Sequence, residues 1–308
     1  MRFAHITLGK AGSQWIKDVL SDPDIFSLQK GLRLAPPPGG MYSIADFAKE
    51  PDGSFVAPIY HVGYSAWKTY SGKDDRCIAV LRDPRDSIVS WAFSTAYSHV
   101  TEEHIQIIRP TMLALDLRGK LEVAMYTFWE SSAAQRSWAQ KPKTKTEYVL
   151  TYESIIADQK KSFRSILDFF GWQASDDVLQ TVIDRLSFKT RSGGRDPGEK
   201  QEFSHYRNGK AGDWKNYFDR SLAQRFEAAC PDLLKELGYE KSSEWWKSVP
   251  EKISGLDEGA VGSKNDSKGL QSTIAALTKR NQLLEEAARA RLEALESAAQ
   301  IAERALTS

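Results

Sequence analysis

Short apolar runs alternate with amphipathic stretches over residues 1 to about 240. Four runs rich in β-branched and aromatic residues predict strands at 2–8, 56–60, 76–81 and 147–151. Apolar residues at helical spacing predict helices at 13–21, 63–70, 84–96, 120–138, 159–170, 175–186 and 220–237. Strands separated by helices favour an α/β fold, a three-layer arrangement in which a mostly parallel sheet is covered by helices on both faces.

The C-terminal part of the chain has a different composition. After a tryptophan-rich stretch, SSEWWKSVP, a Gly-, Ser- and Asp-rich region predicts a flexible linker over 251–269. Residues 270–306 contain no Pro or Gly and are dominated by Ala, Leu, Glu and Arg, which predicts a long helix. The expected organisation is therefore a domain over 1–250, a linker over 251–269 and a C-terminal helix over 270–308.

This helix carries apolar residues at the alternating three-four spacing of a heptad seam, with one extra four-residue step. Asn281 lies on the seam, where a polar residue sets register and oligomeric state. We expect homo-oligomerisation through 270–306. Two other arrangements stay open, a helix that packs back on its own domain and an exposed helix that frays.

Net charge and cysteine content narrow the class of protein. With 42 basic and 41 acidic residues the chain is nearly neutral, so nucleic acid is not an expected partner. Cys77 and Cys230 are expected to be free thiols in a reducing compartment. The sequence has no secretory leader and no apolar run near 18 residues, so we expect a cytoplasmic protein without a membrane span.

Three segments have the character of anion sites. The first, TLGKAGSQW (7–15), is a strand, a glycine-rich turn and a helix start, although it lacks the G-x-x-x-x-G-K-[ST] pattern of the nucleotide loop. The second, VLRDPRDSIVSW (80–91), is a helix start with Asp83 as N-cap, and it also places Arg82 at the end of a strand. The third, YRNGKAGDWKNYF (206–218), is a flexible basic loop or simply a solvated basic turn.

Together these segments resemble the three signatures of sulfotransferases that use 3'-phosphoadenosine 5'-phosphosulfate (PAPS). The resemblance covers residues 7 to about 218 and implies a sheet of the P-loop nucleotide-kinase type. It implies transfer of a sulfuryl group from PAPS to a hydroxyl or amine of an acceptor. No metal is expected, because the donor is already activated and its leaving group is a phosphate.

The resemblance assigns residues to each part of the donor. One set would contact the 5'-phosphosulfate: Lys10, Gly12, Ser13 and Gln14. A second set, from the strand-end arginine and the third segment, would contact the 3'-phosphate: Arg82, Ser90, Arg207, Asn208 and Gly209. Three aromatic residues match positions that pack on or touch the adenine, and core packing is an equally open reading for them: Trp15, Tyr152 and Phe188.

A histidine is suited to accept the acceptor's proton at neutral pH. His61 follows a predicted strand and matches the histidine of the family's K-T-H-L-P pattern, which makes it and Lys10 the expected catalytic residues. Ile59 and Gly63 replace the lysine and the proline of that pattern, so the lysine's contribution must come from Lys10 or be absent. His205 is the second candidate base, and His5, inside a strand, is expected to be structural.

Two other functions stay open at this point. A P-loop-type nucleotide kinase would share the fold, but an aspartate for magnesium is expected where the chain has Arg82. An inactive anion-binding scaffold, assembled through the C-terminal helix, would bind the nucleotide and transfer nothing. The acceptor itself, a small molecule, lipid or glycan, has no signature in the segments expected to face it, 33–55 and 97–120.

Overall fold

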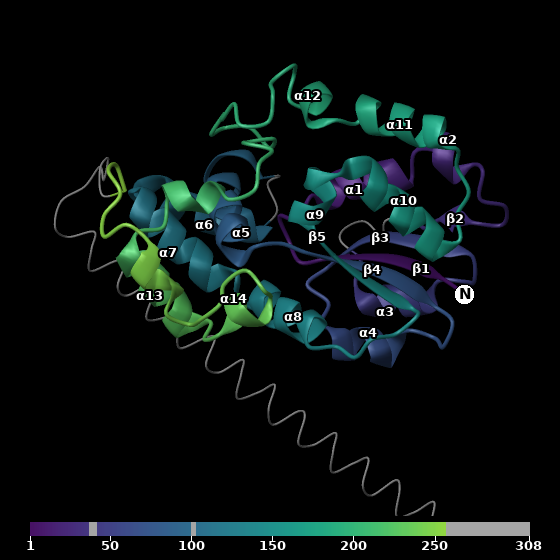
Figure 1. Cartoon of the computed structure of the whole chain (residues 1–308), viewed down its shortest axis with the longest axis horizontal. Helices are drawn as coiled ribbons and strands as arrows, with labels where there is room; N and C mark the ends of the chain where they lie inside the picture. The colour runs from purple at the N-terminus through teal and green to yellow at the C-terminus, as the bar shows by residue number, and fades with distance from the viewer. Residues whose placement is uncertain (37–41, 100–102, 257–308) are drawn as a thin grey trace, which may run out of the picture. The chain divides into compact units, whose positions relative to one another are not determined.

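A computed structural model describes residues 1–36, 42–99 and 103–256 (Figure 1). Its central sheet has five strands in the order β2-β3-β1-β4-β5, and every neighbouring pair is parallel. The strands are β1 (Phe3–Thr7), β2 (Arg33–Leu34), β3 (Ser54–Tyr60), β4 (Arg76–Leu81) and β5 (Glu147–Thr151). The expected α/β class with a parallel sheet is therefore confirmed.

Helices cover both faces of this sheet, as Figure 1 shows. On one face lie α1 (Ser13–Leu20), α2 (Pro23–Phe26), α9 (Tyr152–Ala157), α10 (Gln159–Phe170) and α11 (Asp176–Arg185). On the other face lie α3 (Ile44–Lys49), α4 (Tyr64–Tyr70) and α8 (Trp129–Ala139). The period of two along the strands divides the core, since Ile78 and Val80 pack on the first group of helices while Cys77 and Ala79 pack on the second.

The remaining elements gather beyond the carboxyl ends of the strands (Figure 1). They include α5 (Pro84–Phe93), the π-helical turn η1 (Ser94–Ser98), α6 (Glu103–Ala114), α7 (Leu117–Thr127), α13 (Arg220–Ala229) and α14 (Leu233–Glu236). Three further short helices are α12 (Phe188–Arg191), η2 (Asp213–Asn216) and η3 (Trp245–Ser248). None of the helices in the described part of the chain is long and apolar enough to cross a membrane.

Several sequence predictions need correction. The helix expected at 120–138 is two helices, α7 and α8, that meet at Phe128, whose ψ of 9° interrupts the helical path. The helix expected at 220–237 is interrupted between α13 and α14, where Pro231 cannot continue the backbone ladder. The two-residue strand β2 was not predicted, because so short an edge strand has no period to detect.

The expected linker and C-terminal helix fall almost wholly on residues 257–308, which lie outside the described residues. Their arrangement, and the domain boundary expected at 250, stay predictions.

Parallel strands end at one edge of a sheet, and in such sheets ligands bind there. Four strands of this protein deliver candidate residues to that edge directly after their last residue. The first loop (8–12) follows β1, and three single residues follow β3, β4 and β5: His61, Arg82 and Tyr152. The sheet thereby brings together segments that are far apart in the sequence.

Candidate active site

The loop between β1 and α1 has an unusual backbone. Gly9, Lys10 and Gly12 have φ angles of 75°, 54° and 74°, all in the left-handed region. A lysine is strained there, so the fold imposes this conformation on Lys10 at a cost of order 1–3 kcal/mol. Within the described residues no side chain caps α1, whose first residue follows Gly12, so its N-terminal N–H groups are available to an anion.

Lys10 points from this loop toward the π-helical turn η1. Its Nζ donates a hydrogen bond of 2.9 Å to Oγ of the buried Ser94. Burial, together with the charges of Arg82 and Arg207, lowers the pKa of Lys10 to about 7. Three cations from three separate segments therefore lie close enough to disfavour one another's charge, as expected where a polyanion binds.

Arg82 is buried at the end of β4 and reaches the first loop. Its guanidinium donates to the carbonyl oxygen of Lys10 and lies over the Tyr152 ring, 4.4 Å from the ring centroid. Its backbone N–H donates to Oε1 of Gln135 on α8 at 3.1 Å. The Nε of Arg82 is buried and has no hydrogen-bond partner among the described residues. One donor of this guanidinium thus stays available to a ligand.

Arg207 is buried in the third segment and is only partly neutralised. It pairs with Asp213 at 2.5 Å, donates to the hydroxyl of Tyr217 at 3.2 Å and lies over the Phe93 ring at 4.7 Å. Its Nε and the Oδ1 of the neighbouring Asn208 are buried without a partner among the described residues. The third segment therefore presents both an unused donor and an unused acceptor.

Phe188 lies against the same segment. A Cβ added at Gly209, whose φ is 67°, would meet the Phe188 ring at 2.6 Å, so only glycine allows this approach. The other two aromatic candidates lie at the first loop. The ring of Tyr152 is 3.1 Å from a Cβ built at Gly12, and Trp15 packs edge-on against Phe163 with a centroid separation of 5.3 Å. All three rings are half-buried, and Trp15 and Tyr152 also contact the core.

His61 follows β3 and lies beside the first loop. It has a φ of 56°, and a Cβ built at Gly9 would be 2.9 Å from its Cε1. The side chain is exposed, yet surrounding atoms partly desolvate the imidazole and lower its pKa, while the Glu130 carboxylate raises it. Ile59 is fully buried in the core, so the position that carries a lysine in the resembled pattern faces away from the site.

His205 reaches the same site from the third segment. Partial burial and the charges of Lys10 and His99 lower its pKa to about 4, which keeps the imidazole neutral at pH 7. His5, in contrast, is fully buried in β1 with no partner for either ring nitrogen among the described residues, and burial lowers its pKa to about 3. The structure thus brings two histidines to the loop and keeps the third inside the core.

The sequence did not indicate two residues that contact the candidates. Tyr60, the last residue of β3, places its hydroxyl 3.0 Å from Ser13 Oγ and accepts a 3.0 Å hydrogen bond from Gln14 Nε2. Ser94 accepts the hydrogen bond of Lys10. Ser90, predicted as a contact of the 3'-phosphate, is half-buried one turn earlier on α5, and its role stays a prediction. The sequence signal that could have pointed to Tyr60 is its position directly before His61. No such signal existed for Ser94, because the π-helical turn that orients it has no sequence signature.

The chain is similar in sequence to a known protein family and to several of its members. The sulfotransferase domain family matches residues 6–238. The 3-alpha-hydroxysteroid sulfotransferase of Cavia porcellus is 23% identical over 242 residues, which are 72% of this chain and 79% of that protein. Sulfotransferase 1E1 of Bos taurus is 31% identical over 109 residues, 32% of this chain and 37% of that protein.

A solved structure has the same fold. The chain is similar to mouse sulfotransferase SULT7A1 complexed with PAP, with a TM-score of 0.53 and 19% sequence identity. The match covers 80% of this chain and 88% of that one.

Proposed function

The chain belongs to the sulfotransferase domain family, and from this premise we propose how its site transfers a sulfuryl group from PAPS to an acceptor hydroxyl. The convergence of Lys10, Arg82 and Arg207 carries the proposal, because two of these cations retain buried Nε donors without partners among the described residues. A donor with phosphate groups at both ends supplies the negative charge that this cluster lacks.

The residues fit PAPS in two groups. The first loop, with the uncapped start of α1 and the side chains of Ser13 and Gln14, would hold the 5'-phosphosulfate. Arg82 and Arg207 would turn their free donors to the 3'-phosphate, with Ser90 and the Asn208–Gly209 backbone beside them. The three half-buried aromatic residues, Trp15, Tyr152 and Phe188, would flank the adenine.

Bound PAPS supplies an activated sulfuryl group and a phosphate leaving group. In the proposed mechanism, the imidazole of His61 accepts the proton of the acceptor hydroxyl as its oxygen attacks. The ammonium of Lys10 neutralises charge that builds on the bridging oxygen, an interaction that is strongest in the transition state. The Tyr60 hydroxyl holds Ser13 and Gln14, and through them the start of α1, in place.

Two histidines reach the site, so the base must be tested directly. We expect His61→Ala to lower turnover by about 10²–10⁴ while leaving nucleotide affinity nearly unchanged. His205→Ala is the matched control and should retain most of the turnover, because a pKa of about 4 makes His205 a weak base. The reverse result would transfer the role of base to His205.

For the acceptor we propose a small molecule with a hydroxyl group. A relative named for hydroxysteroids supports this choice over a glycan. We also propose a cytoplasmic location, as expected from the sequence. An acceptor screen with labelled donor, run with the magnesium chelated, tests the transfer, since a nucleotide kinase would lose its activity under those conditions.

Calorimetry tests the donor site independently of any acceptor. Adenosine 3',5'-bisphosphate (PAP) should bind far more tightly than adenosine monophosphate, which lacks the 3'-phosphate. A charge-assisted hydrogen bond is worth about 1.5–3 kcal/mol, so Arg82→Ala should remove most of this preference. Equal affinity of the wild-type protein for the two nucleotides would refute the proposed function.

A further inference from the structure

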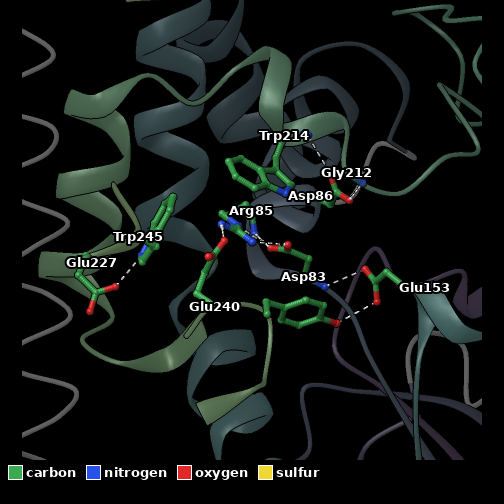
Figure 2. Close-up of polar contacts among 10 residues, drawn as sticks. Asp83, Arg85, Asp86, Glu153, Gly212, Trp214, Glu227, Glu240 and Trp245 are labelled. Carbon is green, nitrogen blue, oxygen red and sulfur yellow. Dashed lines mark hydrogen bonds and ion pairs between the residues drawn. The ribbon is translucent and has the colours of Figure 1, made fainter. Parts of the chain in front are cut away.

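Residues 239–249, here called the tryptophan segment, lie beyond the residues that match the family, which end at 238. This segment contains two adjacent tryptophans, Trp245 and Trp246, that none of the three anion motifs accounts for. In the structure it packs against the start of α5, the helix that follows Arg82 (Figure 2).

Arg85 is the centre of this packing. Its side chain is 2% exposed and makes hydrogen bonds of 3.0 and 2.8 Å to the two carboxylate oxygens of Asp83. A further bond of 2.5 Å links it to Glu240 of the tryptophan segment. Figure 2 shows the guanidinium beside two indole rings, with its Cζ 3.6 Å from the Trp214 centroid and 4.7 Å from that of Trp245.

Trp214 belongs to the third anion segment, and a second contact fixes that segment to α5. The carboxylate of Asp86 accepts the backbone N–H of Gly212 at 2.6 Å and that of Trp214 at 2.8 Å. Asp213, between these two residues, is the partner of Arg207. The position of the Arg207 guanidinium therefore depends on a loop that is held by Arg85 and Asp86.

Two hydrogen bonds hold the tryptophan segment from outside this centre. The indole N–H of Trp245 donates to Glu227 of α13 at 2.8 Å. The hydroxyl of Tyr239 donates to Glu153 at 2.8 Å, and the other oxygen of Glu153 accepts the backbone N–H of Asp83 at 3.0 Å. The segment is thus attached to α13 and α9 while it covers Arg85.

We propose that the tryptophan segment is a positioning element for the 3'-phosphate: through Arg85 and Trp214 it sets the place of Arg207 relative to Arg82. The inference rests on the proposed function, because it assigns the 3'-phosphate to these two arginines. Within the described residues, the hydrogen bonds of the first loop and of the start of α1, which would hold the 5' end, do not involve this segment. Loss of the segment's contacts should therefore affect recognition of the 3'-phosphate and spare the 5' end.

Because the two ends of the nucleotide should respond differently, two nucleotides can test the proposal. The dissociation constants of PAP and of adenosine monophosphate are measured by calorimetry for the wild-type protein and for Trp245→Ala. We expect the variant's preference for PAP to fall by about ten- to a hundredfold, the scale of losing one charge-assisted hydrogen bond to the 3'-phosphate, while its affinity for adenosine monophosphate changes less than twofold. Trp246→Ala is the matched control, since Trp246 contacts Lys247 and is half-buried outside the cluster.

If Trp245 only stabilised the fold, its removal would not lower the affinity for PAP selectively. Equal weakening of both nucleotides in Trp245→Ala, or no change in either, would overturn the inference. If Trp245→Ala does not fold, Trp245→Phe and Glu240→Gln take its place with the same criterion, because the first keeps an aromatic ring at 245 and the second removes one charge at nearly constant size. A wild-type protein without preference for PAP would instead overturn the proposed function, so the two failures are distinguishable.

Discussion

Donor binding should take up a proton at Lys10, and the pH dependence of affinity measures it. In the free protein, burial and the charges of Arg82 and Arg207 lower the pKa of Lys10 to about 7. An anion bound beside the ammonium favours the charged form and raises that pKa again. The lysine is therefore about half protonated at pH 7 before binding and protonated afterwards, so affinity must fall as the pH rises.

The size of the effect follows from the same value. At pH 9, two pH units above a pKa of about 7, about one Lys10 in a hundred still carries its proton. If only the protonated form binds, the affinity for PAP falls about fiftyfold between pH 7 and pH 9, or about 2.3 kcal/mol. Neither phosphate of PAP contributes much in this window, because the second pKa of a phosphate monoester is about 6 and both are mostly dianions from pH 7 upward.

Calorimetry at pH 7, 8 and 9 measures both the affinity and, from buffers with different ionisation enthalpies, the number of protons taken up. Lys10→Arg is the matched variant, since its guanidinium stays charged over the whole range and should abolish the slope. A wild-type affinity that is constant from pH 7 to pH 9 would show that Lys10 is not desolvated as the structure indicates.

Three more predictions concern other parts of the chain. Tyr60→Phe should weaken PAP and adenosine monophosphate alike, by about fivefold in calorimetry, because a hydrogen bond is worth about 1 kcal/mol and this hydroxyl serves the 5' end; loss confined to PAP would contradict it. His5→Leu should raise the free energy of unfolding in urea by about 1–3 kcal/mol at pH 7, since it removes two unsatisfied buried nitrogens. The unfolded chain binds more protons than a native His5 with a pKa of about 3, so wild-type stability should also fall by about 1.6 kcal/mol from pH 6.5 to pH 5, and His5→Leu should lack this component. Truncation after Pro250 should leave the PAP affinity unchanged and reduce the particle mass in light scattering to a monomer, whereas a monomeric full-length protein would exclude the predicted coiled coil.

The fold could be predicted, and candidate site residues could be chosen, because their signals are local. The residues Gly-Lys-Ala-Gly after one strand and Arg-Asp-Pro after another predict where each strand ends. Parallel strands bring such ends to one edge of the sheet. Lys10, Arg82 and His61 were chosen as candidates in this way. The helix expected at 159–170 has the bounds of α10 for a similar reason, since Asp158 caps its start and Gly171 its end.

Contacts between distant segments were not predictable from one sequence. The hydrogen bond of Arg85 to Glu240 joins residues 155 positions apart, and its acceptor is one of many glutamates. Ser94 illustrates a different difficulty, because the π-helical turn that directs it at Lys10 depends on packing and not on residue type. The contact of Ser94 with Lys10 was therefore not predicted, while the separate prediction that Ser90 contacts the 3'-phosphate stays a prediction.

Local motifs and contacts between distant segments together explain why the proposed donor site has two halves. Lys10 lies in the first loop, and Ser13 and Gln14 begin α1 directly after it, so the proposed 5' half follows from a single motif. The proposed 3' half consists of Arg82 at a strand end and Arg207 in a loop 125 residues later. That pair has a fixed geometry only because Asp86 and the tryptophan-stacked Arg85 hold the loop against α5. Selectivity for the 3'-phosphate should consequently respond to substitutions far from the nucleotide, whereas recognition of the 5' end should respond mainly to changes in the first loop and in Tyr60 behind it.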